Sequence, residues 1–260
     1  MADDTLIEEA LFEKSLEIAK SAKVSIKSTR PFANLPSETT ITQQKARMLL
    51  DLPEDSDLLL AGLKAKVRSQ IKKAYKNGLT STLGSLDLLP DFYSVFRENM
   101  RDLGSPVHSR SWIHAILKHY GNRAHAAVVY TPCGEPAAAG IILCHPRAVS
   151  IPWASSLRRF NNLNPNMMLY WTFLKFAADN GYPVFDFGRS TPGEGTFRFK
   201  RQWGANPQYL HWADFKQNRQ LSYSRSSVSA KRKLAESIIT HLPVSVTTAL
   251  GTAARKYIPL

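Results

Sequence analysis

The chain has 260 residues, of which 43% are hydrophobic and 21% charged, a composition that excludes a largely disordered protein. Lys and Arg outnumber Asp and Glu by 34 to 21, and the net charge of +13 favours nucleic acid, phosphate-bearing substrates or an anionic membrane surface as partners. The acidic N-terminus lacks the features of a secretory signal, and no apolar run approaches the ~18 residues of a membrane span, so we expect a cytoplasmic protein.

The cysteines and histidines do not have the spacing of a disulfide or a metal site. Cys133 lies in a predicted turn and Cys144 ends the following strand, about eight residues away at ~3.3 Å each, which is beyond disulfide reach. His114 and His119 are five residues apart on a predicted helix, so they do not share a face. We therefore expect neither a disulfide nor a metal site.

The first part of the chain is predicted to alternate helices and strands. A helical period of apolar residues predicts a helix over Leu6–Ala22, and alternating residues predict strands over Lys23–Thr29 and Arg47–Leu52. Acidic residues then open a basic helix over 56–77, which ends at the C-cap signal Asn77-Gly78.

The middle of the chain is predicted to contain two helices, a β-meander and a third helix. The predicted elements are the helices Leu88–Leu103 and Ser109–Tyr120, the strands His125–Thr131, Ala137–Cys144 and Ala148–Trp153, and the helix Met167–Asn180 with Asn166 as its N-cap. Three further strands are expected at Pro183–Phe187, Thr196–Trp203 and Tyr209–Trp212, before a basic, Ser-rich tail.

The stretch Phe185-Asp186-Phe187-Gly188-Arg189-Ser190, followed by Phe199-Lys200, carries the strongest functional signal. A strand core accommodates Asp186 only if its charge is paired or faces a cleft at the strand end. Arg189 and Lys200 are the expected partners. An active site and a buried salt bridge at a strand end both fit these residues.

Three separated motifs resemble the Fem-type (FemA/FemB-like) aminoacyltransferases, in the branch often found beside exopolysaccharide genes. The motifs are VRSQIKKAYKNG, FYSVFRENMRDLGSP and FDFGRST…GTFRFKRQWGA, and the order of elements matches a GCN5-related acyltransferase (GNAT) scaffold. The resemblance implies an α+β, GNAT-like fold in which the chain splays beside the fourth strand to hold an acyl donor.

Proteins of this group typically have two GNAT-like lobes in tandem, and here only the later half of a first lobe has a counterpart. The resemblance therefore implies a partial first lobe over 1–80, a complete acyltransferase domain over 84–215 and a basic tail over 216–260. We expect a chain truncated at its N-terminus; a partner that supplies the missing half and a decayed remnant are the alternatives. The tail either packs on the second lobe or contacts a membrane surface.

Two groups of cations are candidates for binding phosphate. Arg68 and Lys72 lie on the basic helix, which corresponds to a helix near the inter-lobe cleft of the family, and a solvated helix face is the alternative. The segment Ser155–Pro165 lacks the glycine that a CoA pyrophosphate loop needs, so Arg158 and Arg159 with Asn166 are expected to meet a bulkier donor or the phosphates of an acceptor. An exposed loop is the alternative for the two arginines.

The resemblance also assigns roles in acyl transfer, which needs a positioned amine, removal of its proton and a stabilised oxyanion. Phe199-Lys200 matches a Phe-Lys pair that Fem-type enzymes use at the donor ester, so Lys200 is expected to neutralise the oxyanion or the leaving oxygen. Asp186 would orient or accept a proton from the amine, and Arg189 would anchor the amine or an acceptor carboxylate or phosphate. The remaining substrate-binding candidates are Trp153, Tyr170 and Ser190, and packing in the core is the alternative for the two aromatic residues.

The function expected from the resemblance is transfer of an aminoacyl or acyl group to an amine of a cell-envelope or polysaccharide precursor. The donor would be aminoacyl-tRNA or acyl-CoA, with no tightly bound cofactor, and the acceptor a nucleotide- or lipid-linked sugar. An acyl-CoA-dependent N-acetyltransferase and a non-catalytic remnant that binds an anionic partner are the alternatives. The location would be the cytoplasm, including the inner face of the membrane.

Overall fold

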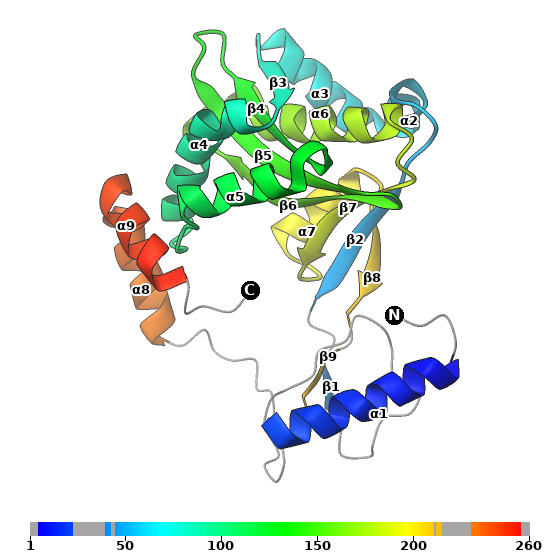
Figure 1. The fold of residues 1–260 in the computed structure, drawn as a ribbon. Helices are drawn as coiled ribbons and strands as arrows, with labels where there is room; N and C mark the ends of the chain where they lie inside the picture. The colour runs from blue at the N-terminus through cyan, green and yellow to red at the C-terminus, as the bar shows by residue number, and fades with distance from the viewer. Residues whose placement is uncertain (1–4, 23–39, 43–44, 211, 215–229, 256–260) are drawn as a thin grey trace.

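A computed structural model describes residues 5–22, 40–42, 45–210, 212–214 and 230–255, and Figure 1 shows its ribbon. Its main body is a mixed sheet with helices on both faces. The helices, in chain order, are α1 (Thr5–Ala22), α2 (Ser56–Gly62), α3 (Ala65–Lys76), α4 (Leu89–Asp102), α5 (Arg110–Tyr120), α6 (Pro165–Asp179), α7 (Gly195–Gln202), α8 (Ala230–His241) and α9 (Val244–Arg255).

The sheet has seven strands in the order β3-β4-β5-β6-β7-β2-β8. They are β2 (Ala46–Asp51), β3 (Thr80–Gly84), β4 (Ala124–Tyr130), β5 (Pro136–His145), β6 (Ala148–Ser156), β7 (Val184–Ser190) and β8 (Asn206–Tyr209). All neighbouring pairs are antiparallel except β6 and β7. The strand β2 therefore joins the same sheet as the meander β4–β6, although more than 70 residues separate β2 from β4 in the chain.

The parallel strands β6 and β7 are paired only at their first residues. Their register consists of Val149 with Phe185 and Ser150 with Asp186, after which β6 continues to Ser156 and β7 to Ser190 without further pairing between them. This separation is the splay expected of a GNAT-like sheet. It leaves the part of β7 after Asp186 bonded to β2 alone.

Each face of the sheet has its own apolar core. On one face, α2, α3 and α6 pack over the sheet, and the buried side chains include Val67, Met168 and Phe185. On the other face, α4 and α5 cover β4–β6, with Phe92 and Ile113 fully buried. The α6 helix is almost wholly buried because apolar residues surround it on nearly all sides.

Several sequence predictions are corrected in the first part of the chain. The helix expected over 56–77 is broken at Leu63, whose extended backbone (ψ 148°) separates α2 from α3. The strand β3 was not expected, because its short, polar sequence TSTLG carries little apolar alternation. The strand expected over Lys23–Thr29 lies outside the described residues.

Two further corrections concern the candidate site. Thr196–Trp203 was expected as a strand but lies mostly in α7, because Phe199 and Trp203 are one helical turn apart and bury the same face. Asn166 is not the N-cap of α6: the helix begins at Pro165, and Asn164, in a left-handed conformation, precedes it. The boundary between a partial first lobe over 1–80 and an acyltransferase domain over 84–215 stays a prediction.

The C-terminal helices pack against α4 and the loop that follows it. A Cβ on Gly104 would approach the Glu236 carbonyl oxygen at 2.7 Å, and one on Gly251 would approach the Val107 nitrogen at 2.6 Å, so both contacts need glycine. Arg255 Nε also donates to His108 Nε2 at 3.2 Å. The described part of the tail therefore packs on the α4–α5 side of the sheet (Figure 1).

Two short strands, β1 (Thr40–Thr42) and β9 (Trp212–Asp214), form a separate two-stranded sheet. Within the described ranges, none of the helices has both the length and the apolar character that crossing a membrane requires.

Candidate functional site

The site predicted around Asp186 is built on a β-bulge in β7. Arg47 of β2 pairs with Arg189, and Leu49 pairs with Asp186, so Phe187 and Gly188 together oppose the single residue Met48. Gly188 has φ +73°, a left-handed conformation that glycine adopts at little cost. The bulge turns the backbone beyond Gly188 and frees carbonyl oxygens from the β-ladder.

Both carboxylate oxygens of Asp186 have hydrogen-bond donors. Oδ2 accepts from Arg47 Nε at 2.7 Å, and Oδ1 accepts from the Gly188 N–H at 2.8 Å. The second bond is a local Asp turn that stabilises the bulge. Asp186 is only 7% exposed, so these donors replace the water that burial removes.

The expected partners of Asp186 are corrected by this geometry. The ion pair is made by Arg47, whereas the Arg189 side chain is exposed and makes no ion pair with any described residue. Lys200 is near enough to Asp186 to feel its charge, but its hydrogen bonds go elsewhere. Arg47 was not identified from the sequence. Its position between the apolar residues Ala46 and Met48, at the start of a predicted strand, was a signal that could have found it.

Lys200 is a buried amine held by backbone carbonyls. Its side chain comes from α7, and Nζ donates to the Arg189 oxygen at 3.1 Å and to the Gly188 oxygen at 3.3 Å. Burial lowers the pKa of Lys200 to about 8, while the Asp186 carboxylate opposes this change by favouring the ammonium. Lys200 thus exchanges its proton much nearer neutral pH than an ordinary lysine.

An aromatic cluster packs beside Lys200. Tyr170 of α6 stacks on Phe187 with ring centroids 5.6 Å apart and meets Phe199 edge-on at 5.0 Å. Phe199 in turn contacts Trp203. Burial raises the pKa of Tyr170, which keeps its phenol protonated. The cluster packs α7 against α6 and β7.

Two buried polar atoms near this cluster have no hydrogen-bond partner among the described residues. They are the Ser190 hydroxyl, two residues after Gly188, and the Trp203 indole nitrogen, on the turn after Lys200. Unpaired buried donors are uncommon in proteins because each costs about 1–3 kcal/mol. Both atoms are buried without a partner among the described residues.

The other predicted residues do not gather at this bulge. Trp153 lies with the core on the α4–α5 face and meets Trp112 edge-on at 5.4 Å, so it does not share a surface with Tyr170. Arg68 Nη1 donates to the Ala61 and Leu63 oxygens and caps the end of α2, whereas Lys72 is exposed on α3.

The arginines of the β6–α6 connection also make contacts within the fold. Arg158 Nη2 donates to the Asp102 oxygen at 3.0 Å. Arg159 forms ion pairs with Glu98 and Glu135. Asn166 is partly buried in the first turn of α6. These contacts fasten the connection to α4 and to the β4–β5 turn, while binding of a donor by these residues stays a prediction.

The described residues place a low-pKa amine and an oriented carboxylate at the bulge of β7, directly after the point where β6 and β7 separate. An ammonium surrounded by little water interacts strongly with a developing negative charge. The arrangement is therefore suited to stabilising an oxyanion. No group of three or more potential metal ligands occurs within the described ranges.

Comparison with known proteins concerns the family and the fold of the chain. Residues 62–201 match a family described as an acetyltransferase (GNAT) domain. None of the curated proteins matches the sequence. The crystal structure of FemX is similar with a TM-score of 0.62 at 15% identity, over 83% of this chain and 78% of that one.

Two further solved structures share the architecture. L-PGS from Bacillus licheniformis is similar with a TM-score of 0.56 at 14% identity, over 89% of this chain and 78% of that one. The C-terminal domain of a putative lysylphosphatidylglycerol synthetase from Agrobacterium fabrum has a TM-score of 0.56 at 13% identity, over 79% and 72% of the two chains. At these identities the likeness concerns the fold, and the expected GNAT-like α+β fold is confirmed.

Proposed function

Because this chain belongs to the acetyltransferase (GNAT) family, we propose that it transfers an aminoacyl or other acyl group to an amine of a cell-envelope or polysaccharide precursor. Acyl transfer is the general activity that the family supports. The narrower choice of group and acceptor rests on the Fem-type motifs and on the fold shared with FemX. A cytoplasmic location, including the inner face of the membrane, is part of the same proposal.

The observation that carries the proposal is the desolvated Lys200 amine beside the bulge of β7. Attack of an amine on an ester or thioester carbonyl forms the new C–N bond and places negative charge on the carbonyl oxygen. The Lys200 ammonium neutralises that charge when the acyl donor lies in the splay. Collapse of the adduct then breaks the C–O or C–S bond to the donor, and the ammonium also neutralises the charge of a leaving oxygen. The two carbonyl partners of Lys200 hold its ammonium in place without neutralising it.

Asp186 acts on the amine in this scheme. Its carboxylate is fixed by Arg47 and the Gly188 N–H, and each oxygen keeps a lone pair with which to accept from an incoming amine. This orients the nitrogen lone pair toward the acyl carbon. The amine proton is then lost to this carboxylate or to water as the C–N bond forms.

The donor is aminoacyl-tRNA or acyl-CoA. The β6–α6 connection has no glycine between Ser155 and Pro165, so backbone amides are less open to a pyrophosphate than in a glycine-rich loop. Arg158 and Arg159 already bond within the fold, which leaves fewer free cations for either donor. The missing glycine counts against acyl-CoA, so we propose aminoacyl-tRNA and keep acyl-CoA as the alternative.

Ligand protection against heat distinguishes the two donors. The donor that binds the folded chain raises the melting temperature, by an amount that grows with its concentration over Kd. We expect aminoacyl-tRNA, or an aminoacylated acceptor-stem fragment, to raise it more than acetyl-CoA at equal excess. A larger effect of acetyl-CoA would favour the N-acetyltransferase. An effect of neither would favour the non-catalytic protein that binds an anionic partner.

A further inference from the structure

The face of the β2–β7 pair that carries Asp186 also carries three cations. Arg47 of β2 is the register partner of Arg189 of β7. Directly opposite residues of an antiparallel pair project from the same face, with Cβ atoms ~5 Å apart. Lys45, two residues before Arg47, extends to Thr191, whose hydroxyl accepts from Nζ at 2.7 Å. Lys45, Arg47 and Arg189 therefore form one cationic cluster.

The position of this cluster in the sheet is unusual. Arg47 and Arg189 are the only Lys or Arg residues within the strands of the seven-stranded sheet that the structure describes, and they stand opposite each other. Like charges directly opposite in a sheet are destabilising. Arg47 alone already satisfies Asp186, and Arg189 is a second cation opposite it.

The cluster is incompletely neutralised. Asp186 engages Arg47 through Nε, so the two terminal amino groups of that guanidinium are not used by the carboxylate. Arg189 is exposed and makes no side-chain hydrogen bond with any described residue, and Lys45 bonds to a neutral hydroxyl. Three positive charges thus face one negative charge.

We propose that Lys45, Arg47 and Arg189 form a binding site for a phosphate or diphosphate group of a substrate. Guanidinium groups present parallel N–H donors that match phosphate oxygens in pairs, and an ammonium adds a point charge. The surplus of two positive charges matches the charge of such a group. The inference deepens the proposed function and rests on it for the identity of the substrate.

The location makes the site useful for positioning. The backbone carbonyl of Arg189 accepts from Lys200, so the residue that binds the phosphate also holds the amine. A substrate anchored by its phosphate at Arg189 has its remaining part directed to the bulge, where acyl transfer takes place. Holding a substrate in this way raises the effective concentration of its reactive group.

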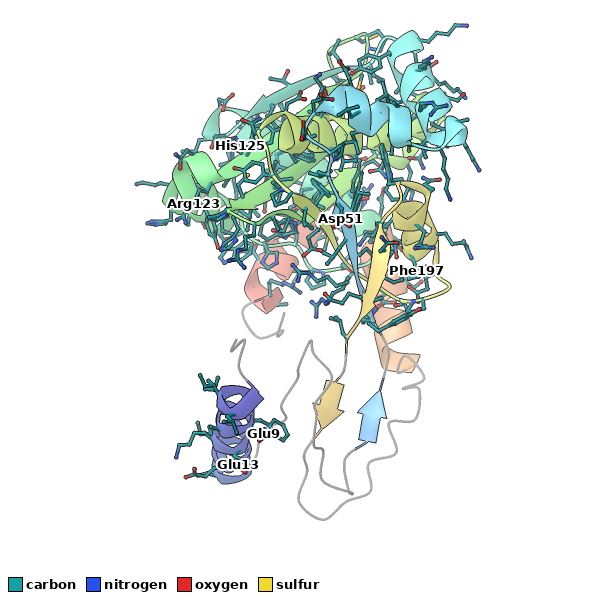
Figure 2. The ribbon with its side chains drawn as sticks, turned by 90° about the vertical axis from the view of Figure 1, so that its right-hand side faces the viewer. Glu9, Glu13, Asp51, Arg123, His125 and Phe197 are labelled. Carbon is teal, nitrogen blue, oxygen red and sulfur yellow. The ribbon has the colours of Figure 1, made fainter. Side chains whose placement is uncertain are left out.

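Inorganic pyrophosphate is a probe that tests the site without acyl transfer. Calorimetric titration of the full chain at fixed ionic strength should show binding that falls by about tenfold or more in Arg189→Gln, because one bidentate contact is lost. The matched control is Arg123→Gln, which removes the same charge from an exposed arginine; Figure 2 shows Arg123 at the opposite end of the sheet from Phe197 of α7.

The outcomes separate this inference from the proposed function. Unaltered binding in Arg123→Gln together with the loss in Arg189→Gln supports the site, whereas equal losses in both, or no binding by the wild-type chain, overturn it. Pyrophosphate binding by a wild-type chain that shows no transfer activity would count against the proposed function alone.

The source of the phosphate follows from inhibition of the transfer reaction. Pyrophosphate should compete with the acceptor if the acceptor is a nucleotide- or lipid-linked sugar, and with the donor if the site holds the phosphates of the donor. Either pattern should weaken in Arg189→Gln. If pyrophosphate competes with neither substrate, the proposal that this cluster binds a substrate phosphate is wrong.

Discussion

Arg47 of β2 and Asp186 of β7, 139 positions apart in the sequence, form an ion pair in which Nε and Oδ2 are 2.7 Å apart. The carboxylate is buried, while the arginine side chain is 41% exposed. This pair joins β2 to the bulge of β7 and places a fixed negative charge near Lys200. The pair therefore has both a structural and an electrostatic consequence.

Arg47→Gln should destabilise the fold by about 1–3 kcal/mol, because it leaves a buried carboxylate without its cation. This value is already reduced for the solvent exposure of the Arg47 side chain. In an Asp186→Asn background, the same substitution should lower the free energy of unfolding by less than about half of that value, because no buried charge is then left without a partner. Urea unfolding of the four proteins measures the coupling. Equal costs of Arg47→Gln in both backgrounds would show that the pair contributes nothing.

The rate of transfer should fall as pH rises through the pKa of Lys200. The ammonium is the form that stabilises an oxyanion, and burial lowers the pKa of Lys200 to about 8 from 10.5, so the ammonium is lost at a lower pH than usual. Lys200→Arg should move this decline to higher pH, because a guanidinium keeps its proton. A decline at the same pH in both proteins would assign it to another group.

Stability should change with pH in the direction that a lowered lysine pKa requires. The folded state binds fewer protons than the unfolded state between pH about 8 and 10.5, so the contribution of Lys200 to unfolding free energy rises with pH across this window. The penalty present below the window, about 3 kcal/mol as an upper value, is relieved above it. Denaturant unfolding of the wild-type chain and Lys200→Met at several pH values isolates this term; parallel curves would contradict it.

Gly188→Ala should impair activity through the bulge. Gly188 has φ +73° and an added Cβ finds only the Ile151 oxygen at 4.0 Å, so the cost is conformational, about 1–2 kcal/mol. Gly181→Ala is a matched control, because its φ is +71° and a Cβ there meets nothing within 4 Å. Both variants should lose similar stability in thermal unfolding, but only Gly188→Ala should lose transfer activity. Equal activity in the two variants would separate the bulge from catalysis.

The sequence predicted the fold well where local periodicity and tertiary packing agree. The helices α4, α5 and α6 and the meander β4–β6 were expected within a few residues of their observed bounds. The α7 helix was wrongly expected as a strand, because Phe197, Arg198, Phe199 and Lys200 alternate like a strand. Packing of Phe199 and Trp203 on Tyr170 overrides that local pattern.

The site was predicted in its residues but not in its pairings. Asp186 and Lys200 stood out because charged groups in a buried strand and beside aromatic residues need a partner. Arg47 did not, because pairing of β2 with β7 depends on the order of strands in the sheet, which no local pattern records. The same limit applies to Arg189, because the bulge that places it opposite Arg47 is not recorded in any local pattern.

The most direct test of a functional Lys200 is to measure transfer of a labelled acyl group to amine acceptors by the purified full chain and by Lys200→Met, with aminoacyl-tRNA and acyl-CoA as donors. The wild-type chain should transfer the label from one donor, and Lys200→Met should be slower by about 10²–10³ while it melts as a folded protein. Equal rates for the two proteins, or no transfer by the wild-type chain from either donor, would contradict the assignment.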